Sequence, residues 1–177
     1  DKKKIAEAIR AAMKNAKPVI LQVAKEFSKI SGRQYGLFEE YHLNDAETAI
    51  VVLNSAAGTV KTVIDELRGK GIKAGLLKPR VFRPFPADEI AQALSGVKAV
   101  CVMDRADGVN GLSGPLFPEF RSALYDAGKR PLMINKIFGL GGRDLGLQPI
   151  RDVFKELLKI SETGKIKTLA EYMTVRN

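Results

Sequence analysis

Residues 71–86 have the sequence Gly71-Ile72-Lys73-Ala74-Gly75-Leu76-Leu77-Lys78-Pro79-Arg80-Val81-Phe82-Arg83-Pro84-Phe85-Pro86. This stretch predicts a buried strand that ends in a basic, proline-rich loop, followed by a helix that begins near Ala87. Three cations, Lys78, Arg80 and Arg83, lie close together where the strand ends. Ligands and partner domains dock at this end of the strands in an open parallel sheet. The loop is therefore a candidate contact region.

The same succession of apolar strand, polar loop and helix repeats around this stretch. Continuous apolar runs such as Ala49-Ile50-Val51-Val52-Leu53 are typical of strands buried on both faces. The predicted strands are 49–53, 73–77, 99–103 and 131–135. The predicted helices are one that follows Thr59 and is ended by Gly69 and Gly71, and three at about 88–94, 118–127 and 149–159. A series of this kind requires right-handed crossovers and a parallel sheet. We therefore predict an α/β fold with three layers, in which helices cover both faces of a parallel sheet that can carry a mixed edge.

The N-terminal part has a different pattern. Residues 3–16 predict an amphipathic helix, and Pro18 predicts the first turn of a second helix that ends at Gly32. Residues 33–47 have the composition of a connector. We divide the chain into a helical arm and connector from a preceding domain (1–47) and an α/β domain (48–177).

Composition excludes several classes of protein. The 177 residues carry a net charge of +9 and include one Cys and one His. No apolar run is long enough to cross a membrane, and a single cysteine excludes an intrachain disulfide or a cysteine-held cluster. Cys101 lies in an apolar strand and is expected to be buried; the chain suits a reducing compartment, most simply the cytoplasm. Basic residues alternate with acidic ones and form no run with aromatics, which argues against nucleic-acid binding.

Four polar loops follow the predicted strands, at residues 54–59, 78–86, 104–114 and 136–144, and meet at the carboxyl edge of the sheet. In the first loop Ser55, Gly58 and Thr59 could cradle an anion with backbone N–H groups. The alternative is that Ser55 or Thr59 only caps the helix. The loop matches neither the Walker nor the dinucleotide-binding glycine pattern.

Two further loops, 107–115 and 138–144, are rich in glycine, which allows close approach of another backbone. Such loops are either packed against another surface, as expected for a domain supported by a neighbour, or mobile, and Arg143 with Asp144 could pair or reach a partner. The chain has no metal-ligand spacing and no nucleophile elbow. The lone His42 is interpreted as a surface or packing residue. We therefore expect no catalytic and no metal-binding residue in this chain.

Several segments, in the same order along the chain, resemble a known family. They are Phe27-Ser28-Lys29-Ile30-Ser31-Gly32-Arg33-Gln34-Tyr35-Gly36-Leu37-Phe38-Glu39-Glu40-Tyr41, Asp45-Ala46-Glu47, the stretch from Gly75 to Pro86, Asp104-Arg105, Gly111-Leu112-Ser113-Gly114-Pro115-Leu116 and Gly139-Leu140-Gly141-Gly142-Arg143-Asp144. Over nearly its whole length the chain resembles core domain II of the alpha subunit of pyruvate:ferredoxin oxidoreductase, with the end of the connector from the first domain.

The resemblance implies a fold similar to the transketolase C-terminal domain and an enzyme that decarboxylates a 2-oxoacid, reduces ferredoxin and forms an acyl-coenzyme A. It implies thiamine diphosphate, Mg and [4Fe-4S] clusters in the parent complex, none of them bound by this chain alone. The implied partners are alpha domain I and the beta, gamma and delta subunits, with ferredoxin as an indirect partner, in a dimer of heteromers without nucleic acid or membrane.

Three hypotheses follow. In the first, the chain is a structural and interface domain of such an enzyme, and Arg80, Arg83, Arg105 and Arg143 contact partner domains or coenzyme A phosphates. The alternative for each arginine is a surface salt bridge. The second hypothesis is a free-standing module that binds nucleotides or phosphorylated metabolites. The third is a module that docks an acidic partner through its positive charge.

Overall fold

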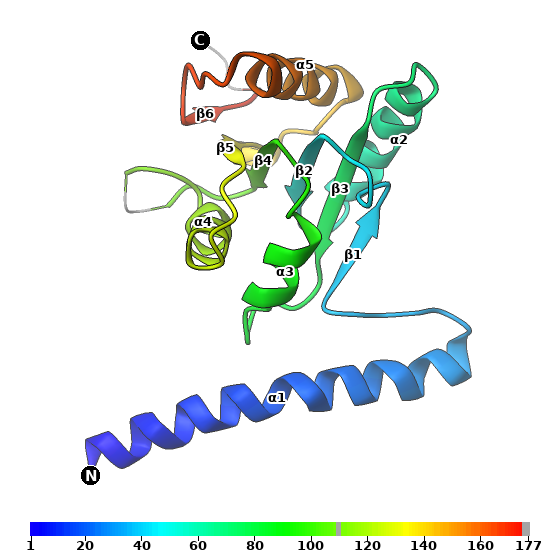
Figure 1. The fold of residues 1–177 in the computed structure, drawn as a ribbon. Helices are drawn as coiled ribbons and strands as arrows, with labels where there is room; N and C mark the ends of the chain where they lie inside the picture. The colour runs from blue at the N-terminus through cyan, green and yellow to red at the C-terminus, as the bar shows by residue number, and fades with distance from the viewer. Residues whose placement is uncertain (109–110, 175–177) are drawn as a thin grey trace. The chain divides into compact units, whose positions relative to one another are not determined.

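The computed structural model describes residues 1–108 and 111–174, and the chain forms two compact units. Unit 1 comprises Asp1–Glu39 with Pro79–Pro86, and unit 2 comprises Glu40–Lys78 with Ala87–Asn177. In chain order the elements are α1 (Lys2–Ser31), β1 (Phe38–Tyr41), β2 (Thr48–Val52), α2 (Ala56–Arg68), β3 (Ala74–Pro79), α3 (Ala87–Ala93), β4 (Ala99–Asp104), α4 (Leu116–Asp126), β5 (Leu132–Ile137), the 3-10 helix η1 (Leu140–Gly142), α5 (Leu147–Thr163) and β6 (Ala170–Tyr172) (Figure 1).

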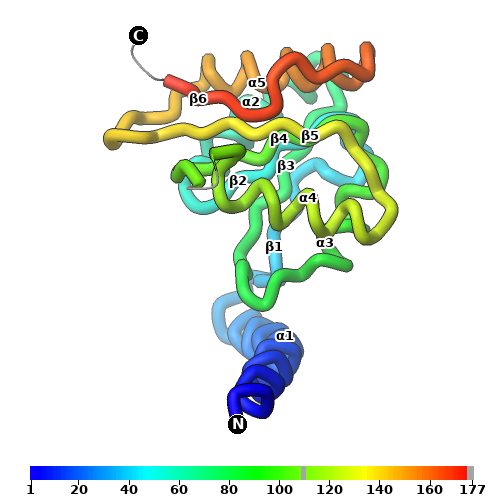
Figure 2. Tube along the Cα trace, turned by 90° about the vertical axis from the view of Figure 1, so that its left-hand side faces the viewer, coloured from blue at the N-terminus to red at the C-terminus, as the bar shows by residue number. Residues whose placement is uncertain are grey.

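The strands form one sheet in the order β1-β3-β2-β4-β5-β6. The pairs β2–β3, β2–β4, β4–β5 and β5–β6 are all parallel. Figure 2 shows β6 running beside β5. The prediction of an α/β fold with a parallel sheet is confirmed.

Both faces of the central strands are covered. Every residue of β2 and β4 is buried, which explains the continuous apolar runs in the sequence. Helices α2 and α5 contact each other on one face, and α3 and α4 contact each other on the other (Figure 1). Ile50, Cys101 and Ile134 join the core that includes α2 and α5. The prediction that Cys101 is buried is confirmed, and burial raises the pKa of its thiol.

Helix α5 shows how the sequence pattern produces this packing. Its buried residues recur every three or four positions along one face, and they are Ile150, Val153, Phe154, Leu157 and Ile160. Gly164 ends the helix in the left-handed conformation, and its N–H donates to the carbonyl of Ile160.

The N-terminal segment corrects one prediction. We expected two helices, with Pro18 in the first turn of the second, but α1 is a single helix that contains Pro18 in its interior. Proline removes one backbone hydrogen bond without ending a helix when the residues around it favour helix strongly, as the Ala- and Lys-rich turns before Pro18 do. The predicted end at Gly32 is confirmed: Gly32 has a φ of 68° and its N–H donates to the carbonyl of Ser28.

Two strands were not predicted. Residues 33–47 were interpreted as a connector, but they contain β1, and the end of the chain contributes β6. Both strands are short, and neither contains a fully buried residue. They therefore lack the apolar run that marks a central strand. The division at residue 47 itself stays a prediction.

Candidate functional site

The order of the strands marks one place at the carboxyl edge of unit 2 as the candidate site. From β2 the chain crosses to β3 on one side, whereas from β4 it crosses to β5 on the other side. The loops that leave β2 and β4 therefore diverge, and a crevice opens between them. Ligands of open α/β sheets bind in such a crevice.

A cavity of about 390 Å³ lies at this position. We call it the switch-point cavity. Its lining comes from the ends of β2 and β4, the start of α2, and the loop after β5. The lining residues are Val52, Leu53, Asn54, Ser55, Ala56, Thr59, Met103, Asp104, Arg105, Phe138, Arg143, Asp144 and Leu145.

The start of α2 forms one wall. Asn54 has a positive φ of 59°, a conformation that asparagine tolerates better than most residues, and it turns the chain sharply from β2 into the helix. Ser55 occupies the N-cap position, but its side chain makes no capping hydrogen bond, and Thr59 lies inside α2. Ser55 therefore occupies the N-cap position that the alternative gave it, but without a side-chain capping hydrogen bond, and Thr59 is not at that position.

The end of β4 forms a second wall, and a buried polar network fixes it. Leu116 N–H donates to Asp104 Oδ1 at 2.8 Å, so this carboxylate caps α4 from a neighbouring strand. Asn135 Nδ2 donates to Asp104 Oδ2 at 2.9 Å, and Asn135 Oδ1 accepts from Gly114 N–H at 2.8 Å. Burial raises the pKa of Asp104, although these donors favour its ionised form.

Gly114 explains one of the two glycine-rich loops. A Cβ at this position would lie 2.2 Å from Asp104 Cβ, so the predicted close approach takes place within this chain. Val109 and Asn110 of the same predicted loop lie outside the described residues.

Arg105 and Arg143 complete the cavity. Gly139 has a φ of 69°, and an added Cβ would lie 3.1 Å from Arg105 Nε. The absence of a side chain at Gly139 therefore lets Arg105 lie across the loop after β5. Among the described residues, no hydrogen bond or ion pair engages the Arg105 guanidinium. Arg143 Nη1 donates to the carbonyl of Thr174 at 2.7 Å, and not to Asp144.

The structure brings together four of the residues selected from the sequence, Ser55, Thr59, Arg105 and Arg143. Gly58 lies within α2 and does not line the cavity. Arg80 and Arg83 belong to unit 1. Arg80 pairs with Glu39 at 2.8 Å and lies 4.9 Å from the centre of the Tyr35 ring, and Arg83 lies 4.1 Å from the centre of the Phe82 ring.

Three polar residues of the site and of the network that fixes it, Asn54, Asp104 and Asn135, are not among the candidates selected from the sequence; Asp104 appears there only within the segment Asp104-Arg105 of the resemblance. Asn54 was assigned to a polar turn, and Asn135 was taken as the last residue of an apolar strand. An amide that ends an otherwise apolar strand was the one signal available for Asn135, because a buried amide needs partners.

Comparison of this sequence with known protein families identifies the family of the chain. A family model described as pyruvate:ferredoxin oxidoreductase core domain II matches residues 46–150. This chain belongs to the core domain II family. The resemblance inferred from its motifs is thus confirmed.

The relatives of this chain described below are subunits of oxidoreductases. Pyruvate synthase subunit PorA of Thermotoga maritima is 43% identical over 147 residues, which are 83% of this chain and 37% of that protein. Ketoisovalerate oxidoreductase subunit VorA of Pyrococcus horikoshii is 39% identical over 165 residues, 93% of this chain and 42% of that protein. A solved 2-oxoglutarate:ferredoxin oxidoreductase from Magnetococcus marinus matches 76% of this chain and 21% of its own, with 17% identity and a TM-score of 0.49. This chain spans about two fifths of the length of these curated relatives.

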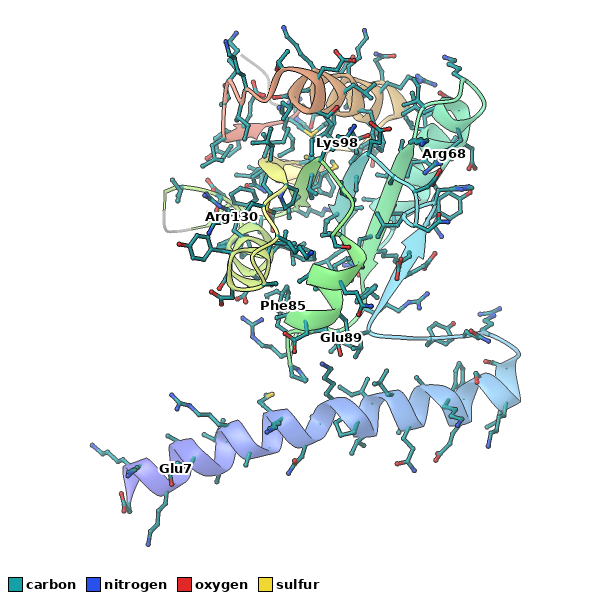
Figure 3. The ribbon with its side chains drawn as sticks, viewed as in Figure 1. Glu7, Arg68, Phe85, Glu89, Lys98 and Arg130 are labelled. Atoms are coloured by element: carbon teal, nitrogen blue, oxygen red, sulfur yellow. The ribbon has the colours of Figure 1, made fainter. Side chains whose placement is uncertain are left out.

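The structure shows what two of the segments that carry the resemblance contact, Asp45-Ala46-Glu47 and the stretch that begins at Gly75. Arg68 of α2, labelled in Figure 3, pairs with Asp45 at 2.8 Å. Lys98, also labelled there, pairs with Glu47 at 2.7 Å. A Cβ on Gly75 would lie 2.8 Å from Ala46 Cβ. The motifs Asp45-Ala46-Glu47 and Gly75 therefore hold the segment before β2 against α2 and β3.

The described residues of this chain do not fit the [4Fe-4S] clusters or the Mg ion that the resemblance implies. Cys101 is the one cysteine, and it is fully buried with a raised pKa, so it is neither accessible nor ionised as a cluster ligand must be. In residues 1–108 and 111–174, no group of three or more His, Cys, Asp or Glu residues could hold a metal ion. No helix in these ranges is long and apolar enough to span a membrane.

Proposed function

We propose that this chain is part of the alpha subunit of a thiamine-diphosphate-dependent 2-oxoacid:ferredoxin oxidoreductase that makes acyl-coenzyme A, with pyruvate as the favoured substrate. Membership of the core domain II family and the names of the relatives support the proposal. Residues 1–47 would be the arm from the preceding domain and 48–177 the core domain. The enzyme would work in the cytoplasm, the compartment favoured by its cysteine usage.

Within that enzyme, the chain would act as a structural and subunit-interface domain. The observation that carries this role is the exposure of the apolar side chains of α1. This 30-residue helix has no buried residue, yet a stripe of large apolar side chains runs along one side of it. Ile5 is 61% exposed, Ile9 57%, Val23 57% and Phe27 48%. Apolar side chains at this spacing normally face a packed neighbour.

The reactive centre would belong to other parts of the complex. Thiamine diphosphate, Mg and the [4Fe-4S] clusters would be held by alpha domain I and the beta, gamma and delta subunits, in a dimer of heteromers, and ferredoxin would be met through those subunits. The chain's own contribution would be to keep neighbouring domains in register through α1 and the glycine-rich carboxyl edge of its sheet.

Activity measurements test the placement in the enzyme. The purified chain is incubated with pyruvate, coenzyme A, thiamine diphosphate, Mg²⁺ and a viologen dye that replaces ferredoxin. We expect no dye reduction, because the described residues offer no site for the clusters that carry electrons. Dye reduction by the chain alone would overturn the proposal.

The interface role needs a test of assembly. In the full complex, Ile9→Glu with Phe27→Glu places two charges in the apolar stripe, whereas Ala11→Glu with Asn15→Glu makes the same charge change outside it. We expect the first variant to lose its partner subunits in size-exclusion chromatography with light scattering, and the control to keep them. Equal assembly of the two variants would contradict an interface at α1, and would leave the activity test unaffected.

A further inference from the structure

We propose that the switch-point cavity binds a small organic molecule that carries a phosphate group, through Arg105 and the donors at the start of α2. The cavity lies entirely within unit 2. The inference therefore goes beyond the proposed interface role and does not depend on it. A domain that only holds its neighbours in register needs no such site.

The cavity offers hydrogen-bond donors for which the described residues supply no acceptor. Among the described residues, no hydrogen-bond partner engages the side chains of Ser55, Thr59 or Arg105, and all three line the cavity. Ser55 is the N-cap residue of α2, but its side chain makes no capping hydrogen bond. A guanidinium with adjacent hydroxyl groups is a donor set that suits the oxygens of a phosphate group.

The charges around the cavity leave room for an anion. Two carboxyl groups, Asp104 and Asp144, also line the cavity. Both oxygens of Asp104 already accept hydrogen bonds, from Leu116 N–H and Asn135 Nδ2, and the positive end of the α4 dipole offsets its charge. Arg143 is held by a neutral carbonyl, so its charge is not neutralised by that contact. The negative charge of Asp144 would repel a bound anion, so a substitution that removes this charge tests the proposal.

The size and polarity of the cavity narrow the class of ligand. A volume of about 390 Å³ falls in the range of small-molecule sites and exceeds what a single phosphate ion fills. Apolar side chains of Val52, Met103 and Phe138 line the same space. The cavity therefore suits a phosphate monoester with a compact apolar body better than inorganic phosphate alone.

Calorimetry on the purified chain with phenyl phosphate, inorganic phosphate and phenol as probes tests the proposal. We expect phenyl phosphate to bind, inorganic phosphate to bind more weakly because it leaves the apolar wall unfilled, and phenol to show no binding. If phenyl phosphate shows no binding at millimolar concentration, or if phenol binds equally well, the proposal fails.

Variants locate the binding. Arg105→Gln should weaken phenyl phosphate binding at least about tenfold, since it removes a charge-assisted contact. Asp144→Asn should tighten binding severalfold, because it removes the opposing charge. Arg121→Gln changes an arginine on α4 that lies over the Phe117 ring and does not line the cavity, so binding should be unchanged. Equal effects of Arg105→Gln and Arg121→Gln would show non-specific attraction to a basic protein and would overturn the site. An unchanged affinity in Asp144→Asn would also count against it.

Discussion

Helices α1 and α5 have similar sequence patterns and different surroundings. Both carry apolar residues every three or four positions, but five of these are buried in α5 and none in α1. Their polar contacts differ in the same way. Glu156 and Arg151 of α5 pair with Lys136 of β5 and Glu66 of α2, whereas Lys3 of α1 pairs with Glu7, one turn further along the same helix.

The comparison teaches that an amphipathic pattern predicts a buried face without identifying what buries it. Hydrophobic burial stabilises a helix only where a complementary surface removes its side chains from water. Unit 2 supplies that surface for α5 from β2, β4 and α2. For α1, we propose that partner domains supply it. The following predictions test this contrast, beginning with the largest expected effect.

Matched isoleucine substitutions give the largest contrast. Ile150→Ala removes a fully buried side chain of α5 and should lower the free energy of unfolding by about 2–5 kcal/mol. Ile9→Ala in α1 removes a side chain that is 57% exposed and should change it by less than about 0.5 kcal/mol. Urea unfolding followed by circular dichroism measures both. Similar losses in the two variants would mean that α1 is packed in the chain alone.

The ion pairs of Lys136 and of Lys3 should also contribute differently to the free energy of unfolding, but the difference should be smaller than that between the two isoleucines. Lys136 Nζ lies 2.6 Å from Glu156 and 2.5 Å from Glu171, and its side chain is 6% exposed. Burial alone would lower the pKa of Lys136, but the two carboxylates hold it above its ordinary value. Lys136→Met leaves both carboxylates without this partner and should cost about 1–3 kcal/mol of unfolding free energy. It should also speed amide exchange in β6.

The control is Lys3→Met in α1, where the pair is 83% and 61% exposed and a cost below about 0.5 kcal/mol is expected. The pH dependence has a definite sign. Because its pKa is raised on folding, Lys136 contributes its stability fully below the ordinary lysine pKa, and the contribution is lost as the pH rises through the raised value. If Lys136→Met has the same free energy of unfolding as the wild-type chain at neutral pH, the ion pairs of Lys136 do not stabilise the fold.

Much of the fold could be predicted from the sequence, for a physical reason. The four central strands are buried on both faces and therefore leave continuous apolar runs, and the helices between them require a parallel sheet. The edge strands β1 and β6 left no such run. Pro18 predicts a boundary because proline is tolerated in a first turn, but α1 continues through it because the residues around it favour helix strongly.

The site was only partly predictable. That Ser55, Thr59, Arg105 and Arg143 lie near the carboxyl edge followed from the loops in which they occur. That these four line one cavity while Arg80 and Arg83 do not depends on the order of the strands, which a sequence pattern alone does not fix. The partner of Arg80 is Glu39, 41 residues earlier in the chain, and no periodicity indicates a contact over that separation.

The smallest predicted effect concerns Glu66 and Arg151, which join α2 to α5 through two hydrogen bonds of 2.8 and 2.9 Å. The hydrogen bond from Arg151 lowers the pKa of Glu66. The contribution of a carboxyl group whose pKa falls on folding is present above its unfolded pKa and is lost as the pH falls through the folded value. Wild-type chain should therefore lose more stability between pH 6 and pH 3 than Glu66→Gln does, as measured by urea unfolding at each pH.

Arg151→Gln should show the same weaker dependence of stability on pH, since it removes the cause of the shift in the pKa of Glu66. High salt should shrink the difference between wild type and Glu66→Gln, because the pair is half-exposed and open to screening. If Glu66→Gln keeps the full acid dependence, the ion pair does not stabilise the contact between α2 and α5, and α5 then differs from α1 in its apolar packing alone.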